Sequence, residues 1–295
     1  APDIQTLIPV VSIVIPSFNR ATLIHERALK SALAQTYEPK EIIVVDDGST
    51  EKYDIQLPAW YYKPWEKNRG GSAARNFGVS KAKGKYIVFI DDDNELRPDF
   101  LKYTVQTLEE LHTIHAVTTA RTIRSEDRTE VVLPDIGTKF KAIDWGWLIR
   151  REVFEKIQYD TCIWGDEDAD FGIQFSNAGF LAYRIEANLQ TCYPAPKHEE
   201  NLTNTYPHPR RLRGLRNFLD KNLHEYTDPN ERRYILRMAG RYYLRAGHYG
   251  MGLRYFFSSY RALPNLRTAT HLLFALGGWR AYDAYMNFYE SNRAA

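Results

Sequence analysis

The feature that most constrains the fold is a repeated order of apolar runs and helical segments in the first hundred residues. Apolar runs occupy residues 10–16 (VVSIVIP), 41–47 (EIIVVDD) and 86–90 (YIVFI), and the intervening residues 21–35 and 70–84 have helical spacing. Strands that read as continuous apolar runs and alternate with helices indicate a parallel sheet covered on both faces. We therefore predict an α/β fold with a doubly wound, mostly parallel sheet and helices on both faces.

Each of these apolar runs ends in a polar cluster: PSFNR after the first, DDGST after the second and DDDNE after the third. In open parallel sheets, ligands bind beyond the carboxyl ends of the strands. The three clusters are therefore expected to converge on one site. The third cluster contains Asp91, Asp92 and Asp93, and three adjacent carboxylates repel one another unless a cation lies among them.

The chemistry of this acidic cluster predicts a divalent metal, Mn²⁺ or Mg²⁺, as cofactor. Such cations favour carboxylate and water oxygens, and they bind through one or two carboxylates plus substrate phosphates, so a nucleotide diphosphate is the expected partner. The alternative is a solvated acidic turn in which Asp93 or Asn94 caps the following helix. The neighbouring clusters favour a ligand site, because the turn explanation would have to be invoked three times.

The chain resembles the family 2 glycosyltransferases with the GT-A fold in four motifs that follow one another: VSIVIPSFNR, EIIVVDDGST, NRGGSAARNFGVSKAKGKYIVFIDDDNELRPDF, and LIRREVFEKI with GDEDADFGIQFSNAGF. The resemblance covers roughly residues 10–203. It implies metal-assisted, inverting transfer of a sugar from a nucleotide-diphosphate donor, a UDP- or GDP-sugar. The expected acceptor is a hydroxyl of a glycan or lipid-linked saccharide in polysaccharide or glycoconjugate synthesis.

The resemblance also implies roles for residues on the donor side. The expected donor- and nucleotide-binding residues are Pro16, Phe18, Arg20, Asp47, Gly70, Arg75, Asp91 and Asp92. Asp91 and Asp93 form the expected metal pair, with Asp93 the more direct ligand, and His198 is expected to complete the metal site or touch the diphosphate. The alternatives are a surface helix arginine for Arg75 and an exposed loop histidine for His198.

Inverting transfer also requires a base, because the acceptor hydroxyl attacks in line and must lose its proton on the face opposite the departing diphosphate. In the family the base comes from an acidic motif well after the metal site, and GDEDADFG matches that motif. The resemblance assigns the base to Asp168, with Glu167 on the acceptor side and Asp166 as the nearest competitor. A charged helix N-terminus is the alternative. Gln174 departs from the family, which often has Arg there, so a diphosphate role at this position is weakened.

Three tryptophans, Trp145, Trp147 and Trp164, flank the predicted acceptor side. Their indole faces could stack on sugar C–H surfaces, and core packing is the equal alternative for each. We expect a catalytic domain over residues 1–205, with a nucleotide-sugar-binding half at about 1–95 and an acceptor-binding half at about 96–205.

Residues 206–295 are expected to form a basic, aromatic-rich helical region. Residues 205–295 contain 14 Arg and 1 Lys against 3 Asp and 3 Glu, a net charge of +9, whereas residues 1–204 carry −7. Two helices joined at GHYG resemble one hairpin of the tetratricopeptide kind. Arginines beside apolar residues suit a helix at a lipid headgroup layer, and packing on the catalytic domain is the alternative. Nucleic acid is not an expected partner, because no recognised binding module is present.

The remaining sequence features bear on location and on rival functions. No window reaches the roughly 18 apolar residues of a spanning helix, and the first ten residues lack a secretory pattern, so we expect a cytoplasmic protein that can lie at the inner face of the membrane. Cys162 and Cys192 are too few for a disulfide framework, and whether they meet is open. A nucleotidyltransferase would need a Gly-rich loop where PSFNR stands. A non-catalytic nucleotide- or sugar-binding protein of this fold remains, although Asp93 and Asp168 argue against it.

Overall fold

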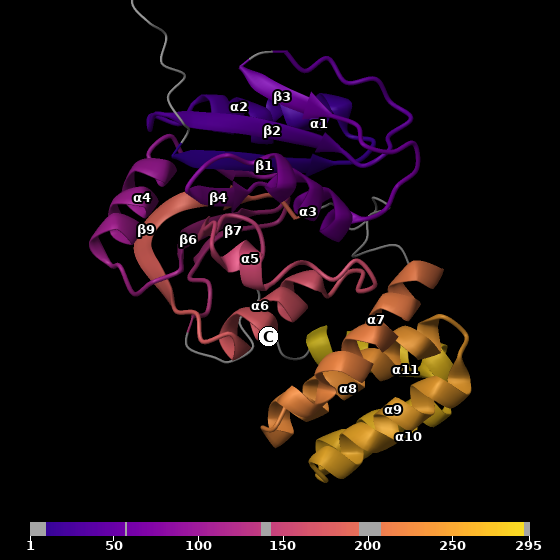
Figure 1. Cartoon of the computed structure of the whole chain (residues 1–295). Coiled ribbons are helices and arrows are strands. Elements are labelled where there is room, and N and C mark those ends of the chain that lie inside the picture. Colours follow the sequence, from indigo (N-terminus) through magenta and orange to yellow (C-terminus); the bar gives the residue numbers. More distant parts are fainter. Residues whose placement is uncertain (1–9, 57, 137–142, 195–207, 292–295) are drawn as a thin grey trace, which may run out of the picture. The chain divides into compact units, whose positions relative to one another are not determined.

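The computed structural model describes residues 10–56, 58–136, 143–194 and 208–291 (Figure 1). The contacts divide the chain into two compact units: residues 1–161 with 167–197, and residues 162–166 with 198–295. We describe each unit by itself. The domain boundary expected at residues 205–206 falls in a segment outside the described residues.

One mixed sheet organises the first unit. Its described strands are β1 (Val11–Ser17), β2 (Lys40–Asp46), β3 (Ala59–Tyr62), β4 (Tyr86–Phe89), β5 (Glu95–Leu96), β6 (Ala116–Arg124), β7 (Thr129–Val132), β8 (Leu148–Arg150) and β9 (Ala182–Cys192). They lie in the order β3-β2-β1-β4-β8-β6-β9-β5, with β7 paired to β6. From β3 to β4 every pair is parallel, as the sequence predicts. Beyond β4 the pairs are antiparallel except β6 with β9.

Six helices are described in this unit, and the first two replace one longer predicted helix. They are α1 (Ala21–Glu26), α2 (Ala28–Leu33), α3 (Gly71–Lys81), α4 (Phe100–Glu110), α5 (Val153–Lys156) and α6 (Glu167–Asn177). The helix expected over residues 21–35 is interrupted at Arg27, whose backbone is not helical (φ −121°, ψ −87°). The short helix α5 begins at Val153, and Arg150 still belongs to β8.

Apolar side chains cover both faces of the sheet. Along β1, Ile13 and Ile15 join one buried cluster, which includes Leu29 of α2 and Val105 of α4. Val14 points to the other face, where the second cluster includes residues from α3 and α6. Two covered faces explain why the strands read as continuous apolar runs, and they confirm the doubly wound α/β class.

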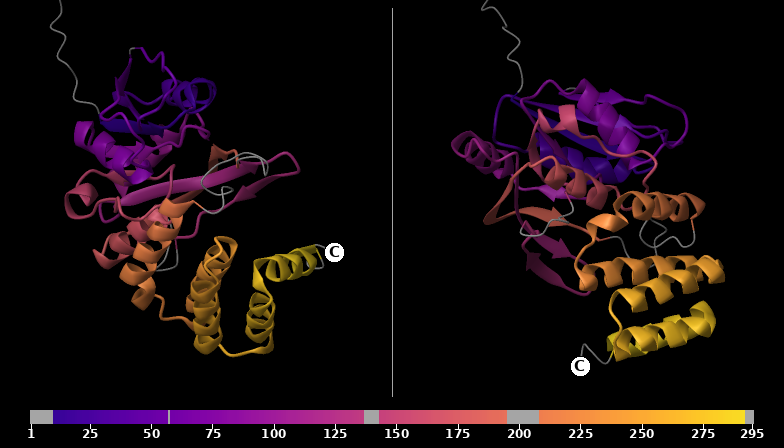
Figure 2. Two further views of the ribbon diagram at one scale, coloured as in Figure 1. Left: turned by 90° about the vertical axis from the view of Figure 1, so that its right-hand side faces the viewer. Right: turned by 60° about the horizontal axis from the view of Figure 1, so that its bottom comes forward.

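The second unit is helical in its described part (Figure 2). It contains α7 (Pro209–Asn222), a short 3₁₀ turn (Leu223–Glu225), α8 (Pro229–Arg245), α9 (Tyr249–Ala262), α10 (Leu266–Leu276) and α11 (Gly278–Ser291). The predicted hairpin is α8 with α9, and Asp228 caps α8 by accepting from two backbone N–H groups. Leu244, Phe256 and Tyr282 lie in the hydrophobic core of this second unit. Among the described helices, none combines the length and apolar content needed to span a bilayer.

Candidate active site

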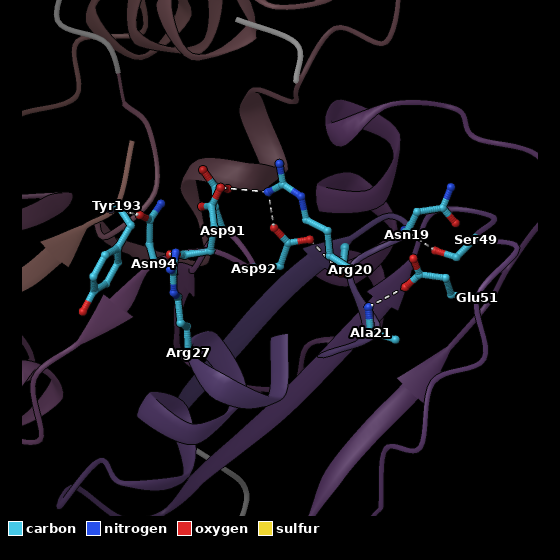
Figure 3. Close-up of polar contacts among 12 residues, drawn as sticks. Asn19, Arg20, Ala21, Arg27, Ser49, Glu51, Asp91, Asp92, Asn94 and Tyr193 are labelled. Atoms are coloured by element: carbon cyan, nitrogen blue, oxygen red, sulfur yellow. Dashed lines mark hydrogen bonds and ion pairs between the residues drawn. The ribbon is translucent and has the colours of Figure 1, made fainter. Parts of the chain in front are cut away.

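The polar ends of β1, β2 and β4 meet at one edge of the sheet, which confirms their predicted convergence. Ser17 Oγ, at the end of β1, donates to Asp92 Oδ2 after β4 over 2.7 Å. The Asn19 backbone N–H donates to Ser49 Oγ, in the turn after β2, over 2.8 Å (Figure 3). The parallel register of the three strands therefore places residues from three distant segments in one site.

Arg20 holds the two last carboxylates of the acidic cluster. Its Nη1 donates to Asp92 Oδ1 over 2.9 Å and to Asp93 Oδ2 over 2.8 Å, and Figure 3 shows the guanidinium reaching toward Asp92. The Tyr53 hydroxyl holds Arg20 and Ser17 in position. It accepts from the Arg20 backbone N–H over 3.0 Å and lies 2.8 Å from Ser17 Oγ. Tyr53 belongs to no motif, so sequence reasoning missed it.

Burial and neighbouring carboxylates raise the pKa values of two residues in this acidic cluster. Burial, followed by the charges of Asp91 and Asp92, raises the pKa of Asp93 to about 6, although Arg20 opposes the shift. Burial also raises the pKa of Asp92. Within the part of the chain that the structure describes, Asp91 Oδ2 and Asp93 Oδ1 accept no hydrogen bond. These two oxygens are free to bind a cation.

Arg75 of α3 connects this cluster to the acidic helix α6. The side chain is buried, its Nη2 donates to Asp91 Oδ1 over 2.8 Å, and its Nη1 lies 3.7 Å from Glu167 Oε1. Burial works against the Arg75 charge, but Asp91 and Asp168 more than offset this effect and raise the pKa of Arg75. The surface-arginine alternative is therefore wrong.

Asp168, the predicted base, lies in the first turn of α6. Its Oδ1 is buried and has no hydrogen-bond partner among the described residues. Burial raises the pKa of Asp168 well above its ordinary value; Arg75 opposes the shift, whereas Glu167, Asp144 and Asp91 add to it. Asp168 thus shares the electrostatic surroundings of Asp91 and Arg75. Its competitor Asp166 lies in the second unit, 3.7 Å from Arg211 Nη2.

Asp47 organises the loop that leads into α3. It accepts four hydrogen bonds of 2.6–2.8 Å, and the donors are Trp65 Nε1, Asn68 Nδ2, Arg69 N and Gly70 N. Gly70 itself has φ +98°, a backbone conformation that favours glycine. Because a carboxylate offers about four lone-pair sites, Asp47 is fully occupied by the loop.

The remaining predicted residues differ in their surroundings. Phe18 is 40% exposed, and Pro16 is half-buried at the end of β1. Trp145 and Trp147 are buried in the two core clusters, so for them the core-packing alternative holds: a side chain without exposed surface offers no face to a sugar. Trp164 lies in the second unit, edge-on to the His208 ring. His198 lies outside the described residues.

An ion pair on β6 was missed by sequence reasoning. Arg121 donates to both carboxylate oxygens of Asp144, over 2.6 and 2.9 Å, and its guanidinium lies 4.9 Å from the Trp145 ring centroid. Asp144 also accepts from Trp147 Nε1. Because Asp144 raises the pKa of Asp168, this pair belongs to the surroundings of the predicted base. Only the Asp-Trp-Gly-Trp sequence beside it could have drawn attention to the position.

The sheet order and the acidic strand ends are those of a GT-A-fold protein. The structure is similar to crystal structures of TarS from S. aureus; residues 1–349 of TarS in complex with UDP-GlcNAc give a TM-score of 0.62 at 15% identity, over 96% of this chain and 92% of that one. The model of glycosyl transferase family 2 matches residues 12–162, about half of the chain. The chain belongs to glycosyltransferase family 2.

Curated relatives are also named glycosyltransferases. An uncharacterized glycosyltransferase of Rickettsia conorii is 34% identical over 127 residues, which is 40% of this chain and 20% of that protein. The uncharacterized glycosyltransferase EpsJ of Bacillus subtilis is 28% identical over 228 residues, 64% of each chain. The chain therefore spans about a fifth of the first relative and just under two thirds of the second.

Proposed function

We propose that the protein is an inverting glycosyltransferase that moves a sugar from a nucleotide-diphosphate donor, a UDP- or GDP-sugar, to an acceptor hydroxyl. The observation that carries this proposal is the free, buried Oδ1 of Asp168 in electrostatic contact with Arg75 and Asp91. A base works best when its pKa lies near the working pH, and burial moves Asp168 in that direction. Asp168 takes the proton of the acceptor hydroxyl.

The acidic turn after β4 fits a divalent cation, Mn²⁺ or Mg²⁺. Asp91 Oδ2 and Asp93 Oδ1 offer two hard oxygen ligands, and Mg²⁺ commonly binds through one or two carboxylates plus substrate phosphates. Among the described residues no group of three or more His, Cys, Asp or Glu side chains could hold a metal, so substrate oxygens would complete the shell. When bound, the cation would stabilise the negative charge of the departing diphosphate.

The chain's own residues shape the donor site around this turn. Arg75 orients Asp91 and balances the charge of Asp91, Glu167 and Asp168. Asp47 holds the loop of residues 65–70, and the Gly70 turn lets the start of α3 approach the donor closely. Arg20 is the cation that would contact the nucleotide part of the donor. His198, outside the described residues, remains a proposed metal or diphosphate contact.

We place the acceptor among glycans or lipid-linked saccharides, with the second unit at an anionic membrane surface. On α10 the side chains of Leu266, Leu273 and Leu276 are 85%, 66% and 65% exposed, and they lie seven and three residues apart. Residues 205–295, which contain this helix, carry a net charge of +9. Apolar residues beside arginines suit a helix at the headgroup layer. Loss of binding to anionic vesicles in Leu273→Glu, with Leu133→Glu as an exposed control, tests this placement.

A melting-temperature screen of nucleotide diphosphates with and without Mn²⁺ tests the donor site. A ligand that binds only the folded chain raises the melting temperature according to RT ln(1 + [L]/Kd), so the preferred base stands out. We expect the Mn²⁺-dependent part of the shift to vanish in Asp93→Asn. A non-catalytic binding protein would show the same shift but no donor hydrolysis, and finding no hydrolysis of any UDP- or GDP-sugar would contradict the proposal.

A further inference from the structure

A cavity on the first unit lies beside the acidic turn, outside the donor site described above. It has a volume of about 360 Å³ and is formed by α2, β5 and the ends of β6 and β9. Sites for small ligands are typically clefts of about 300–1,000 Å³, so this cavity is large enough for one sugar unit. β5 begins two residues after Asp93, which places the cavity next to the predicted metal site along the chain.

Three cations line this cavity without a carboxylate partner. Lys30, Arg97 and Arg124 are all exposed lining residues, and none forms a salt bridge within the described residues. The single acidic lining residue, Glu95, accepts a hydrogen bond from Tyr193 OH over 2.8 Å. Like charges brought together without a counter-ion repel one another, so the cavity has an unbalanced positive potential that favours an anion.

Tyr193, which lines the cavity, and Arg27, which packs on its ring, connect the cavity to the acidic turn. Arg27 lies 4.1 Å from the Tyr193 ring centroid and donates from Nη1 to the Asp93 carbonyl oxygen over 3.0 Å. The Tyr193 backbone N–H donates to Asn94 Oδ1 over 2.9 Å, and Figure 3 shows Tyr193, Asn94 and Arg27 together on this side of the turn. A ligand in the cavity would therefore lie against the wall of the predicted reaction site.

The structure assigns this cavity to an anionic group, a carboxylate or phosphate, on the saccharide acceptor. This inference rests on the proposed glycosyl transfer and adds to it the chemical class of acceptor. Lys30, Arg97 and Arg124 bind the anionic group, and the Thr191 side of the cavity, with the Tyr193 ring, accommodates the sugar unit that carries it.

Calorimetric titration of the full chain, saturated with UDP and Mn²⁺, tests the assignment. The probes are hexagalacturonate as an acidic oligosaccharide, maltohexaose as a neutral one, and inorganic phosphate alone. The variant Lys30→Gln/Arg124→Gln removes two cavity charges. The matched control Lys83→Gln/Lys102→Gln removes two exposed lysines that form no salt bridge within the described residues, one just after α3 and one on α4.

We expect hexagalacturonate to bind the wild type and the control equally and the cavity variant about tenfold more weakly, because two charge-assisted contacts are lost. Maltohexaose should bind weakly to all three. Equal affinity in the cavity variant, equal weakening in the control, or no hexagalacturonate binding at all would overturn the inference. Inorganic phosphate that binds the cavity as tightly as the oligosaccharide would also overturn it, by showing a site for a free anion. UDP affinity is measured separately, so failure of the donor site is distinguishable.

Discussion

Arg75 Nη2 donates to Asp91 Oδ1 over 2.8 Å, and this contact joins helix α3 to the acidic turn after β4. The same guanidinium lies 3.7 Å from Glu167 at the start of α6. Three elements far apart in the sequence therefore share one buried positive charge. The charges of Asp91 and Asp168 both favour the charged form of Arg75. Arg75 therefore balances the charge of the predicted metal ligand and that of the predicted base.

Arg75→Leu should lower the free energy of unfolding by about 2 kcal/mol, because Asp91 and Glu167 lose their common cation while remaining partly buried. The melting temperature, measured without nucleotide or metal, reports the loss. The control Arg128→Leu removes an exposed arginine that pairs with Glu130, and its effect should be less than about 0.5 kcal/mol. Equal melting temperatures for Arg75→Leu and the wild type would show that the contact contributes nothing.

Asp93→Asn should stabilise the metal-free protein at neutral pH. The pKa of Asp93 is raised from 3.8 to about 6, so between these pH values the folded chain binds more protons than the unfolded chain, and stability falls as the pH rises. Above pH 6 the neutral Asn avoids this cost, a gain of about 3 kcal/mol. The gain should disappear near pH 4.

Melting curves from pH 4 to pH 8 in a chelator, with Glu126→Gln as an exposed control, measure this effect. A difference between wild type and Asp93→Asn that stays constant across the range would contradict the raised pKa.

Asp47→Asn should loosen the loop of residues 65–70. The substitution places an NH₂ group among four donors and leaves at least one of them without an acceptor, at a cost of about 1–3 kcal/mol. Hydrogen exchange at Arg69 and Gly70 should become faster, and the same change at exposed Asp54 should leave both amides unaffected. Unchanged exchange in Asp47→Asn would show that the carboxylate does not hold the loop.

Arg20→Gln should increase the affinity for Mn²⁺ in the absence of nucleotide. Arg20 neutralises Asp92 and Asp93, so removing its charge leaves a more negative site for a cation. We expect the Kd for Mn²⁺ alone to fall several-fold, as titrated by electron paramagnetic resonance, and Lys102→Gln to bind like the wild type. Weaker Mn²⁺ binding in Arg20→Gln would mean that the arginine supports the metal site instead.

The sequence predicted the donor half of the fold and site well, for a physical reason. Parallel strands buried on both faces read as apolar runs, and the polar clusters at their ends must meet at one edge, so the convergence of Ser17, Asp92 and Arg20 follows from order alone. The family motifs added Asp168, which no periodicity could have identified.

The second half of the site was less accessible to sequence reasoning. The ion pair of Arg121 with Asp144 and the network of Tyr53 depend on contacts between residues 23 to 36 positions apart that carry no motif. The antiparallel pair of β4 with β8 joins residues 60 to 64 positions apart. Trp145 and Trp147 read equally well as core or as sugar platforms, because an indole suits both settings and only burial distinguishes them.

The role of Asp168 is tested most directly by Asp168→Asn, which keeps the shape of the side chain and removes its ability to accept a proton. With the donor identified by the melting-temperature screen, calorimetry and a transfer assay are run in parallel on wild type, Asp168→Asn and the control Asp160→Asn. We predict that Asp168→Asn binds the donor and Mn²⁺ as the wild type does, and that its kcat for transfer falls by about 100-fold or more. Transfer at the wild-type rate by Asp168→Asn, with donor binding intact, would contradict the assignment of Asp168 as the base.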